Sequence, residues 1–354
     1  MTKGQYTQEA IGLLKQLIAI PSTSRDEREA ADCLQSYMEE RGIQTHRAGN
    51  NVWAIAPDFD KNLPTLLLNS HIDTVKPVTG WTFPPYTPTE QEGRLYGLGS
   101  NDAGASMVSL LQTFRHLCSH KQAYNVIFLA SCEEEVSGKQ GIVSVLPLLP
   151  PISVAIVGEP TGMQPAIAEK GLMVLDVTAH GRAGHAAREE GDNAIYKAMK
   201  DIEWFRSYQW ERISPMLGKV KMTVTQVNAG TQHNVIPESC TFVVDIRSNE
   251  LYTNEELYEH IARQIKSETK ARSFRLNSSR ISQEHPLVQQ IVRMGRTPFG
   301  SPTLSDQALM GFPSLKIGPG DSARSHTANE YILIQEIAEA ISLYQDMLDG
   351  LELM

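Results

Sequence analysis

The chain has 354 residues, of which 41% are hydrophobic and 21% charged, and 41 acidic against 32 basic residues give a formal net charge of −9. This length exceeds the roughly 250–300 residues that one hydrophobic core usually holds, so we expect two domains. The ordinary composition argues against wholesale disorder. The acidic balance argues against nucleic acid or an anionic membrane as the main partner.

The cysteines and the N-terminal segment indicate a cytoplasmic protein. The four cysteines are scattered along the chain and form no CxxC pair, so we expect reduced thiols rather than a disulfide framework. The first 20 residues lack an uninterrupted hydrophobic run, and no stretch approaches the roughly 18 apolar residues of a membrane span. We therefore expect neither secretion nor membrane insertion.

The first half of the chain alternates between helical and strand patterns. Apolar residues at helical spacing predict helices over 7–20, after the cap residues 22–27, and over 103–117. Short apolar runs predict strands over 51–56, 65–70, 125–131 and 154–157. Strands that are apolar throughout and alternate with helices indicate an α/β fold with a central, mostly parallel sheet and flanking helices.

The pattern changes near residue 172. Strands are predicted over 172–179, 219–227, 239–246 and 271–276, with helices over 192–212 and 253–268. This β-α-β-β-α-β order is that of a ferredoxin-like α+β unit. We therefore predict an inserted lid domain over 173–281. The catalytic domain would comprise 1–172 and 282–354, with a helix over 286–296, a strand over 313–317 and a helix over 331–349.

Three adjacent carboxylates, Glu133, Glu134 and Glu135, directly follow the predicted strand 125–131. Acidic residues are depleted in strands, and crowded carboxylates take up protons unless a cation compensates them. The triplet suggests a bound cation, but taken alone it is more simply explained as a solvated acidic turn.

Four further polar points also fall at predicted strand ends or loops. His71 and Asp73 follow strand 65–70, and side chains at i and i+2 of an extended segment face the same way. Asp102 ends a glycine-rich loop, Glu159 closes strand 154–157, and His326 follows a Gly-Pro-Gly turn. Each has a structural alternative, such as a hydrogen bond for the His-x-Asp pair or a helix N-cap for Asp102.

Together these points predict a metal site. Sites in open α/β sheets form outside the carboxyl ends of the strands. Two histidines and several carboxylates that converge there suit Zn²⁺, Co²⁺ or Mn²⁺ better than they suit a soft thiolate-binding metal.

In order, the motifs are HxDTV from His71, GxGxxD ending at Asp102, EEEVxG, GEPT, and a late histidine before an Asn-Glu pair. Over nearly the whole chain they resemble the M20 family of di-metal peptidases and deacylases. The resemblance is strongest to the acetylornithine deacetylase and succinyl-diaminopimelate desuccinylase branch. The family's Arg and Met-Lys around the Asp are replaced here by Leu98 and Ala103-Gly104, which leaves the branch less well defined.

The resemblance implies two divalent metal ions, with Zn²⁺ as the first expectation and Co²⁺ or Mn²⁺ as alternatives. It implies that Asp102 bridges the two ions. His71 and Glu159 would complete one site, and Glu135 and His326 would complete the other.

The resemblance also implies the remaining roles in the site. Glu134 would be the general base, and Asp73 would orient His71. His185, in a glycine loop of the lid, would reach the active site of the partner subunit in a homodimer formed through the lids. The alternative for His185 is a loop histidine without a function. The alternative for Arg247 is a surface salt bridge. Three residues are expected to contact the substrate: Asn234, Arg247 and Gly320.

The implied activity is hydrolysis of an amide bond in a small N-acyl amino acid. The first expectation is N-acetyl- or N-succinyl-ornithine in arginine biosynthesis, with Asp306 or Asp321 as a carboxylate for the distal ammonium. Alternatives within the family are succinyl-diaminopimelate desuccinylation and a dipeptidase or carboxypeptidase activity. From a different class, the chain could be a catalytically silent amino-acid-binding protein.

Overall fold

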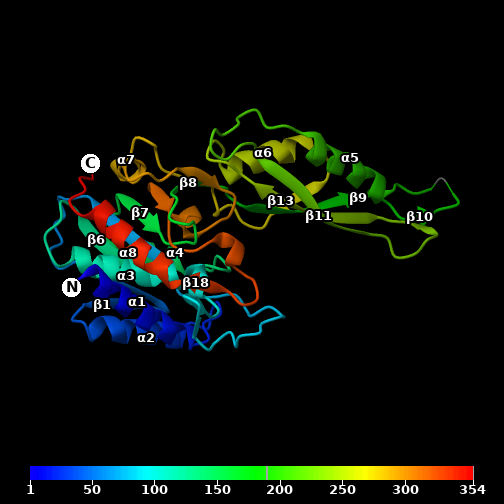
Figure 1. The fold of residues 1–354 in the computed structure, drawn as a ribbon. Coiled ribbons are helices and arrows are strands. Elements are labelled where there is room, and N and C mark those ends of the chain that lie inside the picture. The colour runs from blue at the N-terminus through cyan, green and yellow to red at the C-terminus, as the bar shows by residue number, and fades with distance from the viewer. Residues whose placement is uncertain (189, 354) are drawn as a thin grey trace. The chain divides into compact units, whose positions relative to one another are not determined.

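The computed structural model describes residues 1–188 and 190–353. These residues form two compact units (Figure 1). The first unit comprises Met1–Ile167, Ile281–Phe299 and Ser305–Met354, and the second comprises Ala168–Arg280 and Gly300–Leu304. The expected boundaries at 172/173 and 281/282 lie close to two of these divisions, whereas the short piece Gly300–Leu304 was not expected in the second unit.

The largest sheet has nine strands in the order β1-β2-β6-β3-β7-β17-β8-β15, with β16 paired to β8. Its central strands β6, β3, β7 and β17 are parallel to one another, and the outer pairs are antiparallel. The strands are β1 (Thr45–Ala48), β2 (Asn51–Ile55), β3 (Thr65–His71), β6 (Asn125–Ser131), β7 (Val154–Val157), β8 (Ala166–Glu169), β15 (Ser279–Arg280), β16 (Phe299–Ser301) and β17 (Ser314–Lys316).

Helices and short turns surround this sheet. The helices are α1 (Lys3–Ile18), α2 (Arg28–Glu39), α3 (Ala105–Leu117), α4 (Ile142–Val145), α7 (Pro286–Arg293) and α8 (Ile334–Leu348). The short turns are η1 (Ser100–Gly104), η2 (Leu146–Leu148), η3 (Asp306–Leu309) and η4 (Ser322–Arg324). A three-stranded sheet contains β4 (Thr89–Gln91), β5 (Arg94–Tyr96) and β18 (Tyr331–Leu333).

The sheet is covered on both faces, which explains why its strands are apolar throughout. All seven residues of β6 are buried. On one face the ring of Phe128 lies 6.1 Å from that of Phe114 in α3, and α3 packs against α1 and α8. On the other face Ile127 and Leu129 pack with Ile142 of α4. Alternating strand side chains thus supply two cores, one on each face.

The second unit holds a four-stranded antiparallel sheet in the order β11-β13-β9-β14. Its elements are β9 (Met173–His180), β10 (Gly184–His185), α5 (Ala194–Ser207), β11 (Lys221–Ala229), β12 (Val235–Ile236), β13 (Ser239–Arg247), α6 (Asn254–Gln264) and β14 (Glu268–Ala271). Phe205 of α5 and Leu257 of α6 share one core with the inward side chains of the strands. The main elements follow the β-α-β-β-α-β order.

The predicted α/β fold with a largely parallel central sheet and flanking helices is confirmed, with several local corrections. The strand expected at 271–276 lies instead at Glu268–Ala271, and the helix expected over 331–349 begins at Ile334, after strand β18. The short strands that were not predicted are β1, β4, β5, β8, β10, β12, β15, β16 and β18. Gly104, not Asp102, precedes the first residue of α3, so the N-cap alternative for Asp102 is wrong. Within the described residues no helix is both long and apolar enough to span a bilayer.

Candidate metal centre

The parallel strands bring the predicted metal-binding residues to one edge of the sheet. β3 lies between β6 and β7 and runs parallel to both. His71 is the last residue of β3, the acidic triplet follows β6, and Glu159 comes two residues after β7. The loop before α3 adds Asp102, and the loop after η4 adds His326. All five predicted ligands lie in the first unit.

Asp102 lies between two histidines that come from distant parts of the chain. Its Oδ1 is 3.3 Å from Nε2 of His71, and its Oδ2 is 3.6 Å from Nε2 of His326. Glu159 Oε1 is 3.7 Å from Nε2 of His71, and Glu135 Oε2 is 3.0 Å from Nε2 of His326. These residues form two groups of three, one of His71, Asp102 and Glu159 and the other of Asp102, Glu135 and His326. Within each group the possible ligand atoms lie within 4.8 Å of one another. The two groups share Asp102 through different oxygens.

The electrostatics of this cluster favour added positive charge. Burial raises the pKa of Glu159 to about 8, and the charges of Asp102 and Glu135 add to this while His71 opposes it. Burial also raises the pKa of Glu134 well above its usual value, with contributions from Glu159 and neighbouring acids. Carboxylates in this position retain protons unless cations replace them.

The pKa values of the two histidines are raised as well, but here the cause is hydrogen bonding to carboxylates. Burial lowers the pKa of His71, but its hydrogen bonds to Asp102 and Asp73 outweigh burial, and the net pKa lies well above the usual value. The hydrogen bond to Glu135 raises the pKa of His326 to about 9. Both rings therefore sit in a strongly anionic field.

The residues present fit a pair of divalent ions. Each group offers one imidazole nitrogen and two carboxylates, one of which is shared, and this is a nitrogen and oxygen donor set for Zn²⁺, Co²⁺ or Mn²⁺. The raised carboxyl pKa values show that the positive charges of the protein itself do not balance the negative charge of the cluster.

Comparison with known proteins identifies the family. Residues 67–350 match the family described as peptidase family M20/M25/M40. The chain belongs to this family. It is therefore a metal-binding hydrolase of a class of enzymes that cleave amide bonds.

Individual relatives of this M20 chain are distant. It is 25% identical over 362 residues to a succinyl-diaminopimelate desuccinylase of Corynebacterium glutamicum, covering 96% of each chain. It is 25% identical over 289 residues to the enzyme of that name from Wolbachia pipientis wMel, covering 77% of this chain and 73% of that one.

Solved structures share the fold of this M20 chain. Aminopeptidase PepT of Bacillus cereus matches with a TM-score of 0.76 and 17% identity, over 97% of this chain and 98% of that one. The Bacillus subtilis YxeP protein, described as a dinuclear metal-binding peptidase, matches with a TM-score of 0.75 and 17% identity, over 98% of this chain and 100% of that one.

Asp73 holds the site of this M20 chain through its backbone as well as its side chain. Nδ1 of His71 lies 2.9 Å from the main-chain oxygen of Asp73 and 3.5 Å from its carboxylate. The carboxylate accepts the N–H groups of Glu134 and Glu135 at 3.0 and 3.1 Å and the hydroxyl of Ser24 at 2.7 Å. The expected orienting contact thus comes chiefly from the carbonyl, and the carboxylate positions the acidic triplet.

Sequence reasoning gave no role to two buried carboxylates that position the loops. Glu330 is only 2% exposed and accepts the backbone N–H groups of Gly99, Asn101 and Asp102 at 3.2, 2.8 and 2.9 Å. Glu27, which is fully buried, accepts the N–H of Glu133 at 3.1 Å. The Asn-Glu pair after His326 was the only sequence signal for Glu330.

Three predicted site residues lie in the second unit. His185 pairs with Val235 in the small β10-β12 ladder. The N–H of Ala186 donates to the main-chain oxygen of Asn234 at 2.9 Å. The backbone at His185 therefore lies beside that of Asn234. The Arg247 guanidinium forms two hydrogen bonds to Asp245 at 2.8 and 3.0 Å. Arg247 would have to exchange this carboxylate for that of a substrate.

Gly320 is buried in the first unit beside the loop of Asp102. A Cβ at this position would lie 2.3 Å from Oδ1 of Asn101, and the glycine adopts a φ of +92°. Its expected contact with substrate stays a prediction, and its tight packing against Asn101 explains why a side chain is excluded there.

We predict that Glu330→Gln weakens metal binding by about 10- to 100-fold, the usual effect of losing a partner behind a metal ligand. The amide keeps the shape of the carboxylate but turns an NH₂ group toward backbone N–H donors, which disorders the loop of Asp102. Affinity is measured by competition with a chromophoric chelator. The matched control is Glu339→Gln, an exposed change on α8. Equal affinities for Glu330→Gln and the unmodified chain would contradict this role.

Proposed function

We propose that this chain hydrolyses the amide bond of a small N-acyl amino acid, using two divalent ions held at the candidate metal centre, with Zn²⁺ as the first expectation. The observation that carries this proposal is Asp102, whose two oxygens face different histidines beside the half-buried Glu134. His71 and Glu159 would hold one ion, and Glu135 and His326 the other. Co²⁺ and Mn²⁺ are the alternatives.

Glu134 is the proposed general base. Ions bound at the centre would polarise the substrate carbonyl and lower the pKa of the attacking water. Glu134 takes a proton from that water and passes it to the leaving nitrogen, so one carboxylate acts as base and then as acid. Its backbone N–H is fixed by Asp73 at 3.0 Å, which holds the turn that carries the side chain.

We predict that Glu134→Ala abolishes turnover and leaves metal content nearly unchanged, because a proton shuttle of this kind contributes about 10²- to 10⁴-fold to the rate. Initial rates and metal content by mass spectrometry are measured on the same preparation. Glu352→Ala, at an exposed position near the C-terminus, is the control. A variant that keeps a third of the original rate would exclude this role.

The acyl group and the amino acid are the finer part of the proposal. The hypothesis of an ornithine substrate assigns the distal ammonium to Asp306 or Asp321. The contacts of these two side chains give this hypothesis little support. Asp306 is 3% exposed and accepts the hydroxyl of Ser131 at 2.6 Å, and Asp321 accepts the N–H of Ala323 at 2.9 Å. Both carboxylates already have structural partners. The names of the relatives favour a second candidate, succinyl-diaminopimelate.

A panel of substrates tests this proposal. The metal-loaded chain is assayed for amine release from N-acetylornithine, N-succinylornithine, N-succinyl-diaminopimelate and a dipeptide. We expect at least one acylated diamino acid to be cleaved faster than the dipeptide, and cleavage of both ornithine derivatives would support arginine biosynthesis. Preference for the dipeptide would move the chain to the peptidase alternative. Metal binding without amine release from any compound would favour a catalytically silent binding protein.

We also propose that the chain forms a cytoplasmic homodimer through the second unit. β11 is an edge strand of its sheet and is largely exposed, although a long exposed edge is normally covered or blocked. Tyr196 and Met199 of α5 and Val227 of β11 are 67%, 58% and 54% exposed. An apolar face beside an open strand edge suits a second copy of the chain. The resemblance assigns His185 a contact with the active site of the partner subunit.

We predict that Val227→Asp converts the dimer to a monomer, because two like charges would meet near the symmetry axis of the paired edges. Sedimentation velocity measures the mass. Val292→Asp, on an exposed face of α7 in the first unit, is the matched control and should leave the mass unchanged. A parent chain that sediments as a monomer at tens of micromolar would rule out this assembly.

A further inference from the structure

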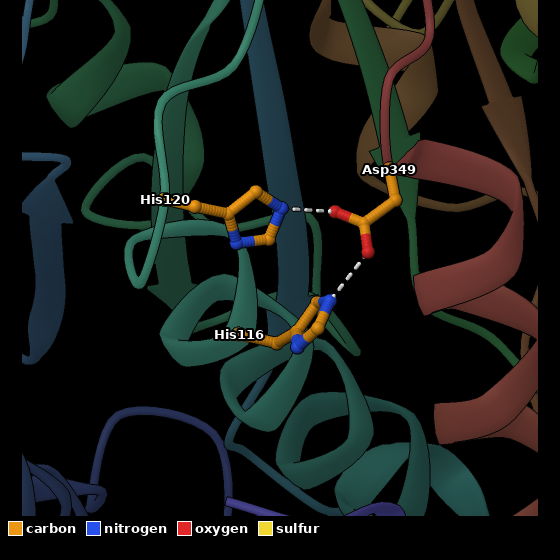
Figure 2. Close-up of side chains that lie close together, drawn as sticks. All are labelled: His116, His120 and Asp349. Carbon is orange, nitrogen blue, oxygen red and sulfur yellow. Dashed lines mark hydrogen bonds and ion pairs between the residues drawn. The ribbon is translucent and has the colours of Figure 1, made fainter.

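A second cluster of metal-binding side chains lies at the opposite end of α3 from Asp102. It contains His116 in the last turn of α3, His120 just beyond this helix, and Asp349 at the end of α8 (Figure 2). At about 1.5 Å per residue, the 13 residues of α3 place this cluster ~20 Å from the loop of Asp102. It is therefore distinct from the candidate metal centre.

The two imidazoles converge on one carboxylate. Nε2 of His116 is 2.6 Å from Oδ2 of Asp349, and Nε2 of His120 is 2.7 Å from Oδ1. The three possible ligand atoms lie within 4.8 Å of one another. Figure 2 shows both rings directed at the Asp349 carboxylate from the end of α3 and from the turn that follows it.

The hydrogen bonds around His120 leave a place for a cation. The Gln122 amide donates to Nε2 of His120 at 2.9 Å and to Oδ1 of Asp349 at 3.2 Å. In the tautomer that carries its proton on Nδ1, Nε2 accepts this bond, and an ion that displaces the Gln122 amide meets the Nε2 lone pair 2.7 Å from the Asp349 oxygen. The other ring nitrogen, Nδ1, lies 3.1 Å from the hydroxyl of Ser119, whose oxygen can accept a hydrogen bond from Nδ1–H. This tautomer presents Nε2 as a ligand.

Helix electrostatics favour a positive charge at the same place. Asp349 is the C-cap of α8, and α3 ends at Leu117, one residue after His116. Both helices therefore direct their negative ends toward this region, where a carboxylate is unfavourable by itself. A divalent ion bound by Asp349 would compensate both helix ends and the carboxylate.

We propose that His116, His120 and Asp349 form a second, surface-accessible site for Zn²⁺ or a similar borderline metal, which joins the end of α8 to the end of α3. Two imidazoles and one carboxylate are a common zinc ligand set, with solvent completing the tetrahedron. The side chains of His116, His120 and Asp349 are 21%, 47% and 37% exposed, so an ion can enter. With bonds near 2.0–2.1 Å, tetrahedral ligands lie ~3.3 Å apart, so the present separations of 2.6 and 2.7 Å must each lengthen by roughly 0.6–0.7 Å when an ion binds.

The test compares zinc content between matched variants of the full chain. The parent chain, His120→Gln and Asp349→Asn are loaded with Zn²⁺, freed of excess ion, and analysed by mass spectrometry. We expect each variant to carry one zinc ion fewer per chain than the parent and to bind that ion at least tenfold more weakly. His46→Gln, at an exposed position in the same unit, is the control and should lose none. Mg²⁺ should not compete at an imidazole-rich site.

Thermal unfolding separates a metal site from a simple pair of hydrogen-bonded ions. Zn²⁺ should raise the melting temperature of the parent chain by more than it raises that of His120→Gln. Equal zinc content and equal zinc-induced shifts in parent and variant would overturn the proposal and leave an ion pair only. Because the comparison is a difference between variants, it holds whether or not the candidate metal centre loads. If Asp349→Asn fails to fold, the exposed His120→Gln still decides the question.

Discussion

The gathering of like charge at one sheet edge is the constraint on which the rest of this structure depends. Four ionised carboxylates at this edge would repel one another: those of Asp102, Glu134, Glu135 and Glu159. Burial raises the pKa of Glu134 and Glu159, and the neighbouring acids raise it further. Such a cluster is kept only where positive charge can be supplied. His71 and His326 supply part of this positive charge. The arrangement of possible ligands around Asp102 suits bound ions that would supply the rest.

The protein holds this unfavourable arrangement with buried hydrogen bonds behind the ligands. Three buried carboxylates, Glu27, Asp73 and Glu330, each accept backbone N–H groups from the loops that carry the cluster. These hydrogen bonds satisfy backbone groups of the loops and fix loops that the sheet alone would leave free. The candidate metal ligands therefore depend on a second set of acids that lie behind them in the loops.

The helix α3 connects two anionic regions of the first unit. Its N-terminal end follows Asp102, and its C-terminal end carries His116 beside Asp349. α3 packs against α8 and against β3 and β6 of the sheet.

The residue pattern by itself determined the elements that are long and buried, and it selected the candidate ligands. Strands such as β3 and β6 are buried along their whole length, so their apolar runs were legible, and the polar residues at their ends stood out. β1, β4, β5 and β18 were missed because they are short and partly exposed, so burial imposes little pattern on them. β14 was displaced because its sequence, ETKA, alternates only weakly.

Tertiary structure alone decided which distant residues meet. Glu330 lies more than 220 residues from the three backbone groups it binds, and Asp349 lies 233 residues from His116. No local pattern encodes such partners, because they are set by how strands pair and helices pack rather than by neighbouring residues. The sequence could name which side chains are chemically able to bind metal, and only the folded chain could show which of their atoms face one another.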